Sequence, residues 1–195
     1  GMAAHSSLAP LAVNAVHLAC DLVSAIRSRQ QSIIETGTHD EAYNIPYTTL
    51  HVGRIEGGVQ VNIVPQEASL EFEIRNLAGD DPAILIEAIT QDIAPVIAAA
   101  RKTSAEADIR LTVVNSYPGL ETALDERVVA LLRDLTGVNA TCKVAFGTEG
   151  GLFARDLGIP TVVCGPGSMD QGHKPDEFVT VEQLAICDQM LGGLT

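Results

Sequence analysis

The chain has 195 residues, a formal net charge of −13 and a hydrophobic fraction of 46%, with a mean hydropathy of +0.20. This length suits one domain or two small ones, and the apolar fraction excludes a chain that is disordered throughout. An acidic surface repels phosphate backbones, so nucleic-acid binding is disfavoured as a main role. No apolar run is expected to span a membrane, because the longest candidate, residues 8–26, is interrupted by Asn14, His17 and Asp21. No signal peptide is indicated.

The cysteines predict a reducing compartment. They are widely spaced in apolar surroundings and form no Cys-x-x-Cys pair: Cys20, Cys142, Cys164 and Cys187. A zinc ribbon or a redox dithiol is therefore unsupported. Buried, reduced thiols in a cytoplasmic protein are the simplest interpretation.

The first 117 residues predict five elements in the order helix, strand, strand, helix, strand. Apolar residues recur every three or four positions from Leu8 to Ile26, and Ser6 or Ser7 is expected to cap this helix. Residues 68–75 alternate between apolar and polar side chains, which is typical of a strand with one buried face. The other expected elements are a loop over 37–46, a strand over 47–55, a turn over 56–58, a helix from Asp80 to Arg101 and a strand over 107–117.

This order is that of a ferredoxin-like βαββαβ unit that lacks its first strand. The first strand of such a unit lies in the centre of the sheet. We therefore expect an incomplete sheet covered by two helices.

From Pro118 onward, short helices alternate with short apolar strands. Helices are expected over 124–135, 150–157 and 181–191, and strands over 142–146 and 160–164. Such alternation favours a parallel α/β sheet buried on both faces. Two strands cannot close a domain of this kind alone.

A glycine-rich loop, residues 163–177, follows the second of these strands and contains His173. The carboxyl end of a buried strand is the usual place for a ligand in an α/β sheet. Acidic residues on both sides of His173 could orient its imidazole toward a metal ion. One histidine makes no metal site, however, because zinc needs three or four protein ligands.

Ordered motifs along nearly the whole chain resemble the M20 metallopeptidase family, and within it the acetylornithine deacetylases. The C-terminal motifs are Phe146-Gly147-Thr148-Glu149-Gly150-Gly151, Gly158-Ile159-Pro160-Thr161, Gly165-Pro166-Gly167 and His173-Lys174-Pro175-Asp176-Glu177-Phe178. The N-terminal motifs are Ala3-Ala4-His5-Ser6-Ser7, Val52-Gly53-Arg54-Ile55-Glu56-Gly57-Gly58, Asn62-Ile63-Val64-Pro65 and Glu73-Ile74-Arg75.

The resemblance implies an α/β fold in two parts. Residues 3–117 would form an incomplete ferredoxin-like βαββαβ dimerisation lid. Residues 118–195 would form the C-terminal part of a zinc-peptidase-like parallel α/β catalytic domain.

The resemblance also implies residue roles in the lid. His5 would reach into the active site of the other subunit and polarise the scissile carbonyl or stabilise the oxyanion. Asn62 and Arg75 would bind substrate, and the guanidinium of Arg75 could pair bidentately with a carboxylate. From the residues alone, His5 could instead be a capping or exposed histidine, and Arg75 an exposed strand charge.

In the second part, His173 would be a zinc ligand, and Thr148 and Glu149 would lie beside the substrate. Glu149 could equally cap the helix that follows it. His17, His39 and His51 belong to no matched motif, and structural roles are expected for them.

The family's remaining metal ligands and its general base belong to a segment ahead of the lid, and no His-x-Asp precedes His5 in this chain. The family uses two zinc (or cobalt) ions. We expect this chain alone to retain neither ion and to hydrolyse no amide.

The implied activity is zinc-dependent hydrolysis of an N-acyl amino acid, with conversion of N-acetylornithine to ornithine and acetate in arginine biosynthesis as the first candidate. The implied partners are this small substrate and a second copy bound through the lid, with no nucleic acid and no membrane. Succinyl-diaminopimelate desuccinylase and a related dipeptidase or carboxypeptidase are alternatives. A non-catalytic dimerisation module is an alternative of another class.

Overall fold

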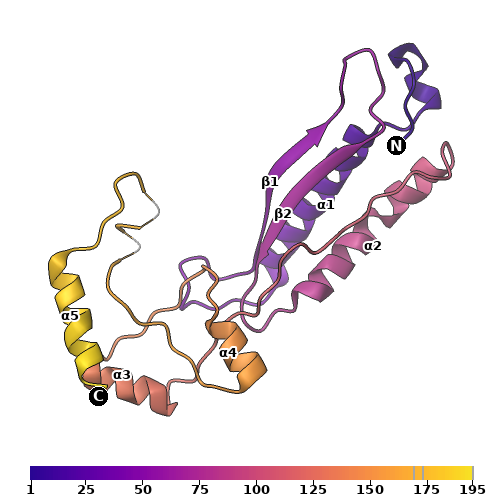
Figure 1. Cartoon of the computed structure of the whole chain (residues 1–195). Coiled ribbons are helices and arrows are strands. Elements are labelled where there is room, and N and C mark those ends of the chain that lie inside the picture. Colours follow the sequence, from indigo (N-terminus) through magenta and orange to yellow (C-terminus); the bar gives the residue numbers. More distant parts are fainter. Residues whose placement is uncertain (169, 173, 195) are drawn as a thin grey trace. The chain divides into compact units, whose positions relative to one another are not determined.

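The computed structural model describes residues 1–168, 170–172 and 174–194 and divides the chain into two compact units (Figure 1). The first unit contains Gly1–Ser116 and Lys143–Phe146, and the second contains Tyr117–Cys142 and Gly147–Thr195.

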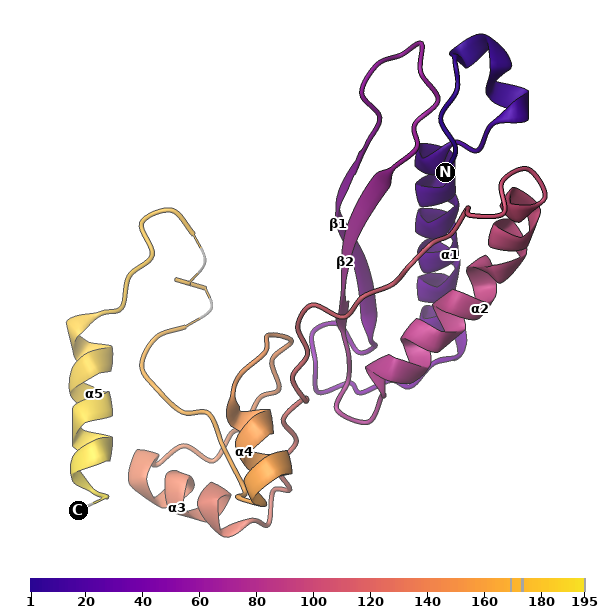
Figure 2. The same ribbon diagram turned by 45° about the vertical axis from the view of Figure 1, so that its right-hand side comes forward.

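The first unit is a layer of two helices on a two-stranded antiparallel sheet. The main elements are α1 (Ala15–Thr36), β1 (Thr49–Gly57), β2 (Ala68–Arg75) and α2 (Pro82–Arg101). Helix α1 lies against both strands and against α2 (Figures 1 and 2). The predicted order of helix, strand, strand and helix is confirmed.

Four buried side chains form the centre of this layer. Leu22 and Ile26 of α1 meet Ile89 and Ile93 of α2, and Ile89 has no exposed surface. Apolar side chains on the inner face of the sheet cover this cluster: Leu50, Val52, Leu70 and Phe72. Burial of these branched side chains is the main stabilising contribution to the unit, at roughly 1.5–3 kcal/mol for each fully buried residue.

The sheet contains a β-bulge between Val52 and Arg54. Leu50 pairs with Ile74 and Val52 with Phe72, and beyond the bulge Ile55 pairs with Leu70. The extra residue, Gly53, shifts the alternation by one position. Ile55, at an odd position, therefore continues the row of side chains that Leu50 and Val52 begin at even positions. Strict alternation in the sequence does not predict this row.

The first helix begins later than predicted, and a different residue caps it. Residues Ser6–Leu11 form a short 3-10 helix, η1, and α1 begins at Ala15 with Asn14 as its cap. The Asn14 Oδ1 accepts hydrogen bonds from the backbone N–H groups of Val16 and His17. Between the two helices, Val13 exchanges two backbone hydrogen bonds with Met2, and this pairing requires an extended chain where a continuous helix was expected.

Three expected strands are absent from the described residues, namely 107–117, 142–146 and 160–164. Ile109 and Leu111 still pack against the core cluster, so the first segment covers apolar surface without joining the sheet. A strand needs a hydrogen-bonded neighbour, and these segments lie beside none. The mixed α/β class is confirmed, with a small antiparallel sheet; the described chain has no parallel sheet.

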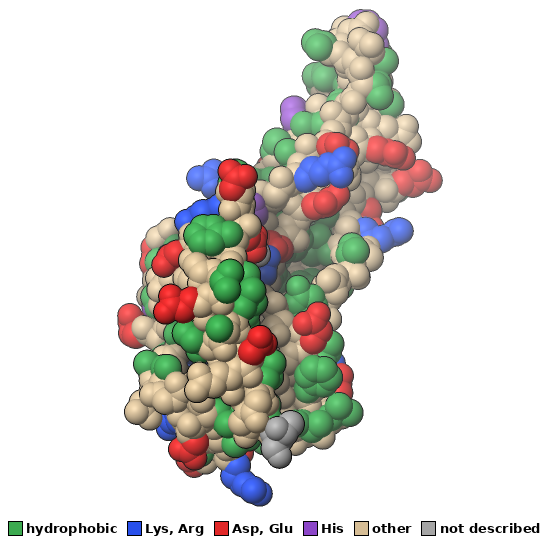
Figure 3. Space-filling view, turned by 60° about the vertical axis from the view of Figure 1, so that its left-hand side comes forward, with side chains coloured by type: hydrophobic (Ala, Val, Ile, Leu, Met, Phe, Trp, Pro, Cys, Tyr) green, Lys and Arg blue, Asp and Glu red, His purple; other side chains and the backbone are tan. Residues whose placement is uncertain are grey.

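The second unit contains three short helices: α3 (Arg127–Thr136), α4 (Gly150–Leu157) and α5 (Val181–Gly192). Many of its apolar side chains stay in contact with solvent, with Val181 83% and Leu157 62% exposed. Figure 3 shows hydrophobic side chains of this kind among acidic ones on one face of the molecule. Exposed apolar surface of this extent is typical of a surface that another element covers.

One expectation from composition was wrong. Cys20, Cys142 and Cys164 are exposed and Cys187 is half-buried, although all four were expected to be buried; all are free thiols.

Within the described chain, α2 is the one helix long and apolar enough to cross a membrane, with a mean hydropathy of 1.6. Such a helix is weak evidence for a membrane span, because core helices of soluble proteins meet the same criterion.

Replacing Ile89 by Ala should lower the free energy of unfolding of the first unit by about 2–5 kcal/mol, because it leaves a cavity in the core. Ile89→Val should cost about 0.5–1.5 kcal/mol. The control is Ile84→Ala on the same helix, where the side chain is 65% exposed. Urea unfolding followed by circular dichroism measures all three, and equal losses for Ile84→Ala and Ile89→Ala would contradict the packing described.

Candidate active site

The structure brings two of the predicted lid residues, His5 and Asn62, together in the first unit. His5 precedes η1, and Asn62 lies in the loop between β1 and β2. Two backbone hydrogen bonds join their segments and together form the His5–Ile63 bridge: the Ser6 N–H donates to the Asn62 carbonyl at 2.9 Å, and the Val64 N–H donates to the Ala4 carbonyl at 2.8 Å. The two residues are therefore held next to each other by main-chain pairing.

The imidazole of His5 is exposed and also caps η1. Its Nδ1 accepts a hydrogen bond from the Ser7 backbone N–H at 3.3 Å and lies 2.9 Å from the Ser7 Oγ. Nε2 has no partner among the described residues. The capping role that the residues alone suggested is therefore present, and it leaves one ring nitrogen available to a ligand.

Exposed apolar side chains surround these two residues in the sequence. Val61, adjacent to Asn62, is fully exposed, and Leu11 of η1 is 68% exposed. The others are Leu8, Val59 and Ile63. Sequence reasoning missed this apolar group, although the alternating run of Val59, Val61 and Ile63 around Asn62 was a usable signal. Such a group suits contact with a protein surface better than contact with water.

Arg75 lies away from His5 and Asn62. It ends β2, whereas Asn62 lies before its beginning, so roughly 20 Å of strand separates them. Its guanidinium forms an ion pair with Glu73 at 3.0 Å. The side chain of Arg75 is 44% exposed and faces solvent with Glu73. The first unit, as described, therefore does not bring Arg75 together with His5 and Asn62.

Thr148 and Glu149 lie in the second unit, directly before α4. The Thr148 Oγ1 accepts from the Gly150 N–H at 3.3 Å, and Glu149 makes no side-chain capping bond, contrary to the structural alternative for it. Gly151, the second residue of α4, is buried, and a Cβ there would lie 2.1 Å from the carbonyl oxygen of Pro118. Only glycine permits this approach, which fixes the start of α4 and thereby the position of Glu149 within its unit.

The segment 143–146, which leads to Thr148, belongs to the first unit. Lys143 Nζ forms an ion pair with Asp40 at 2.7 Å and lies 5.4 Å from the centre of the Tyr43 ring. The hydrogen bond from Lys143 holds the pKa of the Asp40 carboxyl below its usual value, with a further contribution from the Ala42 N–H. These residues are about a hundred positions apart, and sequence reasoning missed the pair.

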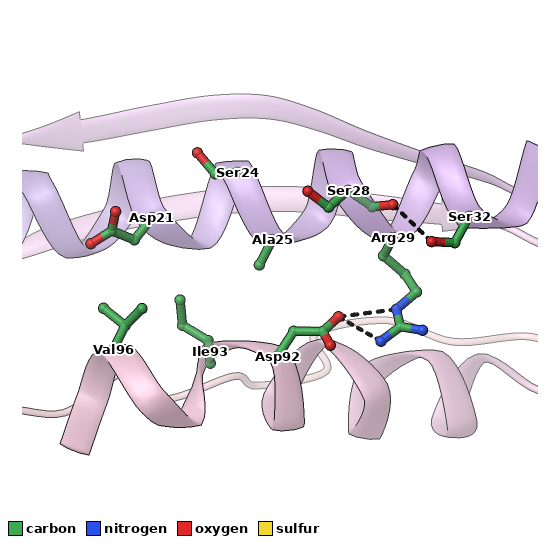
Figure 4. A pocket seen from close by; sticks show the side chains of 9 residues that line it. All are labelled: Asp21, Ser24, Ala25, Ser28, Arg29, Ser32, Asp92, Ile93 and Val96. Atoms are coloured by element: carbon green, nitrogen blue, oxygen red, sulfur yellow. Dashed lines mark hydrogen bonds and ion pairs between the residues drawn. The ribbon is translucent and has the colours of Figure 1, made fainter. Parts of the chain in front are cut away.

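A groove without these residues lies in the first unit, between α1 and α2 (Figure 4). The Arg29 guanidinium crosses it to Asp92 at 2.6 Å, so its main charges neutralise each other. It has a volume of about 480 Å³ and is lined by Asp21, Ser24, Ala25, Ser28, Arg29, Ser32, Asp92, Ile93 and Val96. It contains none of the predicted site residues.

No metal centre is assembled by the residues that the structure describes. They contain no group of three or more His, Cys, Asp or Glu side chains that could hold an ion. The predicted ligand His173 lies outside the described residues. The donor set present does not fit a zinc pair, so no step of a reaction is derived through metal.

Comparison with known proteins decides the family. The peptidase dimerisation domain of the M20 family matches residues 1–101. The chain belongs to the M20 peptidase family. The match covers η1, α1, the sheet and α2, so the unit that contains His5 and Asn62 is the family's dimerisation domain.

Similar proteins extend the match beyond this domain. Acetylornithine deacetylase of Yersinia pestis is 30% identical over 197 residues, covering 100% of this chain and 48% of that protein. Its counterpart from Myxococcus xanthus is 36% identical over 155 residues, covering 78% of this chain and 38% of that protein. The chain thus spans about half the length of the curated relatives it matches, or less.

Solved structures show the same fold. A tripeptidase from Staphylococcus aureus has a TM-score of 0.70 at 24% identity, covering 97% of this chain and 47% of that one. An M20 family metallo-carboxypeptidase from Sulfolobus solfataricus has a TM-score of 0.59 at 19% identity, covering 98% of this chain and 58% of that one.

The Asp40–Lys143 pair should give a pH-dependent contribution to stability. Because the folded-state pKa of Asp40 is lowered, this contribution is full above the unfolded-state value, about 3.9, and is lost as the pH falls through the folded-state pKa. Asp40→Asn should therefore lower the urea midpoint at neutral pH, and the difference from the wild type should shrink below about pH 4. Asp21→Asn, at an exposed carboxylate without an ion pair in the described chain, is the control, and a difference independent of pH would contradict the assignment.

Proposed function

We propose that this chain supplies the dimerisation lid, residues 3–117, and the C-terminal part of the catalytic domain, residues 118–195, of a metal-dependent amidohydrolase that cleaves N-acyl amino acids. The favoured substrate is N-acetylornithine, which gives ornithine and acetate and places the enzyme in arginine biosynthesis. The observation that supports this most is the continuous similarity to acetylornithine deacetylases over 100% of the chain.

His5 is the proposed catalytic residue of the lid. A neutral imidazole with a free Nε2 can donate a hydrogen bond to the carbonyl oxygen of the scissile amide and to the oxyanion that follows. Its exposure and the apolar side chains next to it support action in the active site of a second subunit. Asn62, held beside it by main-chain bonds, is the proposed substrate contact nearest to the reacting group.

Arg75, Thr148 and Glu149 are the other proposed substrate-binding residues. Arg75 would pair with a carboxylate, but it must first exchange Glu73 for the ligand. Its distance from Asn62 suggests that the two residues serve different substrate groups or different active sites of a dimer. His173 is the proposed ligand of a zinc or cobalt ion. A site for two such metal ions requires further ligands that the described residues do not supply.

Two observations favour other functions. Solved structures with the same fold include peptidases, so cleavage of a peptide is the second candidate. Cleavage of a succinylated amino acid is a further alternative that rests on the sequence resemblance alone. The match to a dimerisation domain, together with a described chain that assembles no metal site, favours a non-catalytic dimerisation module as the third. A cytoplasmic location and the absence of nucleic-acid and membrane partners stay predictions.

The catalytic proposal can be tested in a chimera. The matched 197-residue stretch of the Yersinia pestis enzyme is replaced by this chain, and turnover is measured on N-acetylornithine, N-succinyl-diaminopimelate and a tripeptide. N-acetylornithine should be the best substrate, and His5→Ala should lower kcat by about 10²–10³-fold, as loss of an oxyanion donor does. His173→Ala should lower metal content as well as turnover, and His17→Ala, an exposed helix histidine, should change neither.

The chain alone is the second arm of this experiment. It should bind almost no zinc and release no ornithine after metal saturation. Two zinc ions per chain with turnover would show that its ligands are complete. If a folded, metal-loaded chimera prefers the succinyl substrate or the tripeptide, that activity replaces N-acetylornithine hydrolysis as the proposed function. A folded chimera that is inactive on all three substrates would favour the non-catalytic module.

The lid should form a homodimer through β1, whose outer edge has no strand partner among the described residues. Light scattering of concentrated protein should give about twice the 20.5 kDa of one chain. Amide exchange should then show stronger protection of residues 49–57 at high than at low concentration, with α5 as an internal control. A monomer at all concentrations, or protection that changes equally everywhere, would contradict this interface.

A further inference from the structure

We propose that Ser7 is a positioning residue that fixes His5 in the tautomer whose proton is on Nε2. This inference rests on the proposed function for its catalytic meaning, while the tautomer itself is a property of the chain. It follows from which groups in this segment can donate a hydrogen bond and which can only accept one.

The Ser7 backbone N–H can only donate, and it is directed at the Nδ1 of His5. A nitrogen that accepts this bond must offer a lone pair, so it carries no proton. In a neutral imidazole the single proton must then be on Nε2. The opposite tautomer would place two N–H groups against each other.

The Ser7 hydroxyl adds a second donor to the same nitrogen. Its Oγ lies 2.9 Å from Nδ1, and because Nδ1 has no proton to give, the hydroxyl is the donor of this bond. Two donors from one residue therefore converge on one lone pair. No other polar group among the described residues competes for either ring nitrogen of His5.

Ser6 shows that this is specific to position 7. Its backbone N–H bonds to the Asn62 carbonyl, and its side chain makes no hydrogen bond to His5 in the described structure. The two neighbouring serines thus have different roles. Ser6 holds the backbone of the histidine segment, and Ser7 determines which ring nitrogen of His5 carries the proton.

The fixed tautomer decides what His5 can do. With the proton on Nε2, the free nitrogen is a donor and stabilises an oxygen that gains negative charge in the transition state. With the proton on Nδ1, the free nitrogen would present a lone pair to that oxygen and repel it. The Ser7 contacts therefore favour an oxyanion-stabilising histidine over a general base.

Nitrogen NMR of the imidazole groups tests this in the chain itself. Uniformly ¹⁵N-labelled histidine is used at a pH at which the ring is neutral, and His5→Ala identifies the His5 signals. The wild type and Ser7→Thr should show His5 with its proton on Nε2. Ser7→Ala, which keeps only the backbone donor, should show a mixture. Ser7→Pro, which removes both donors, should show a larger share of the other tautomer.

Ser6→Ala is the matched control and should leave the His5 signals unchanged. A wild-type His5 with its proton on Nδ1, or a tautomer ratio equal in the wild type, Ser7→Ala and Ser7→Pro, overturns the inference whatever the activity. In the chimera, Ser7→Ala should lower kcat by about 10-fold with little change in KM, and Ser7→Thr should restore it, as expected for a group that orients a reacting residue. A fixed tautomer in an inactive chimera supports this inference and rejects the proposed function.

Discussion

The main-chain pairing of residues 4–6 with residues 62–64 is the constraint on which the lid's chemistry depends. It joins the beginning of the chain to the loop between β1 and β2, and Val64 at one end of it is only 3% exposed. The next residue, Pro65, accepts a hydrogen bond from the Ala15 N–H, so the same segment also holds the start of α1. Each such bond contributes about 0.5–1.5 kcal/mol, and together they give His5 one position relative to Asn62.

The two units contain different parts of the predicted site. The first contains His5, Asn62 and Arg75, and the second contains Thr148 and Glu149. The covalent chain joins the units before and after the short segment 143–146, which the Asp40–Lys143 pair attaches to the first unit. This ion pair is therefore the contact that ties the residues leading to Thr148 to the first unit.

Features that depend on local chemistry could be predicted from the sequence. The strict alternation over Ala68–Arg75 and the Asp81-Pro82 start of α2 reflect local rules, and the structure contains both. Features that depend on a distant partner could not. The cap at Asn14 depends on the pairing of Val13 with Met2, and the row of apolar side chains on β1 depends on a bulge that β2 defines.

The same distinction explains the strands that are missing. Residues 160–164 include three consecutive β-branched residues, Thr161, Val162 and Val163, which favours a strand, yet a strand exists only beside a hydrogen-bonded neighbour. For the site, the motifs identified His5 and Asn62 as candidates but did not predict that they lie side by side. Their proximity depends on a bridge between segments more than fifty residues apart. The position of Arg75 at the far end of β2 was equally outside what a motif can show.

His5 as a helix cap and His5 as a catalytic donor are two aspects of one arrangement. The cap uses the lone pair of Nδ1, and occupying that lone pair places the proton on Nε2, where a substrate oxygen would need it. If the ring instead capped η1 through Nε2, the nitrogen proposed to act on the substrate would already be bonded to the helix. The 3-10 helix that follows His5 is therefore more than a connection to α1, because its second N–H group holds the histidine ring in the form that can stabilise negative charge.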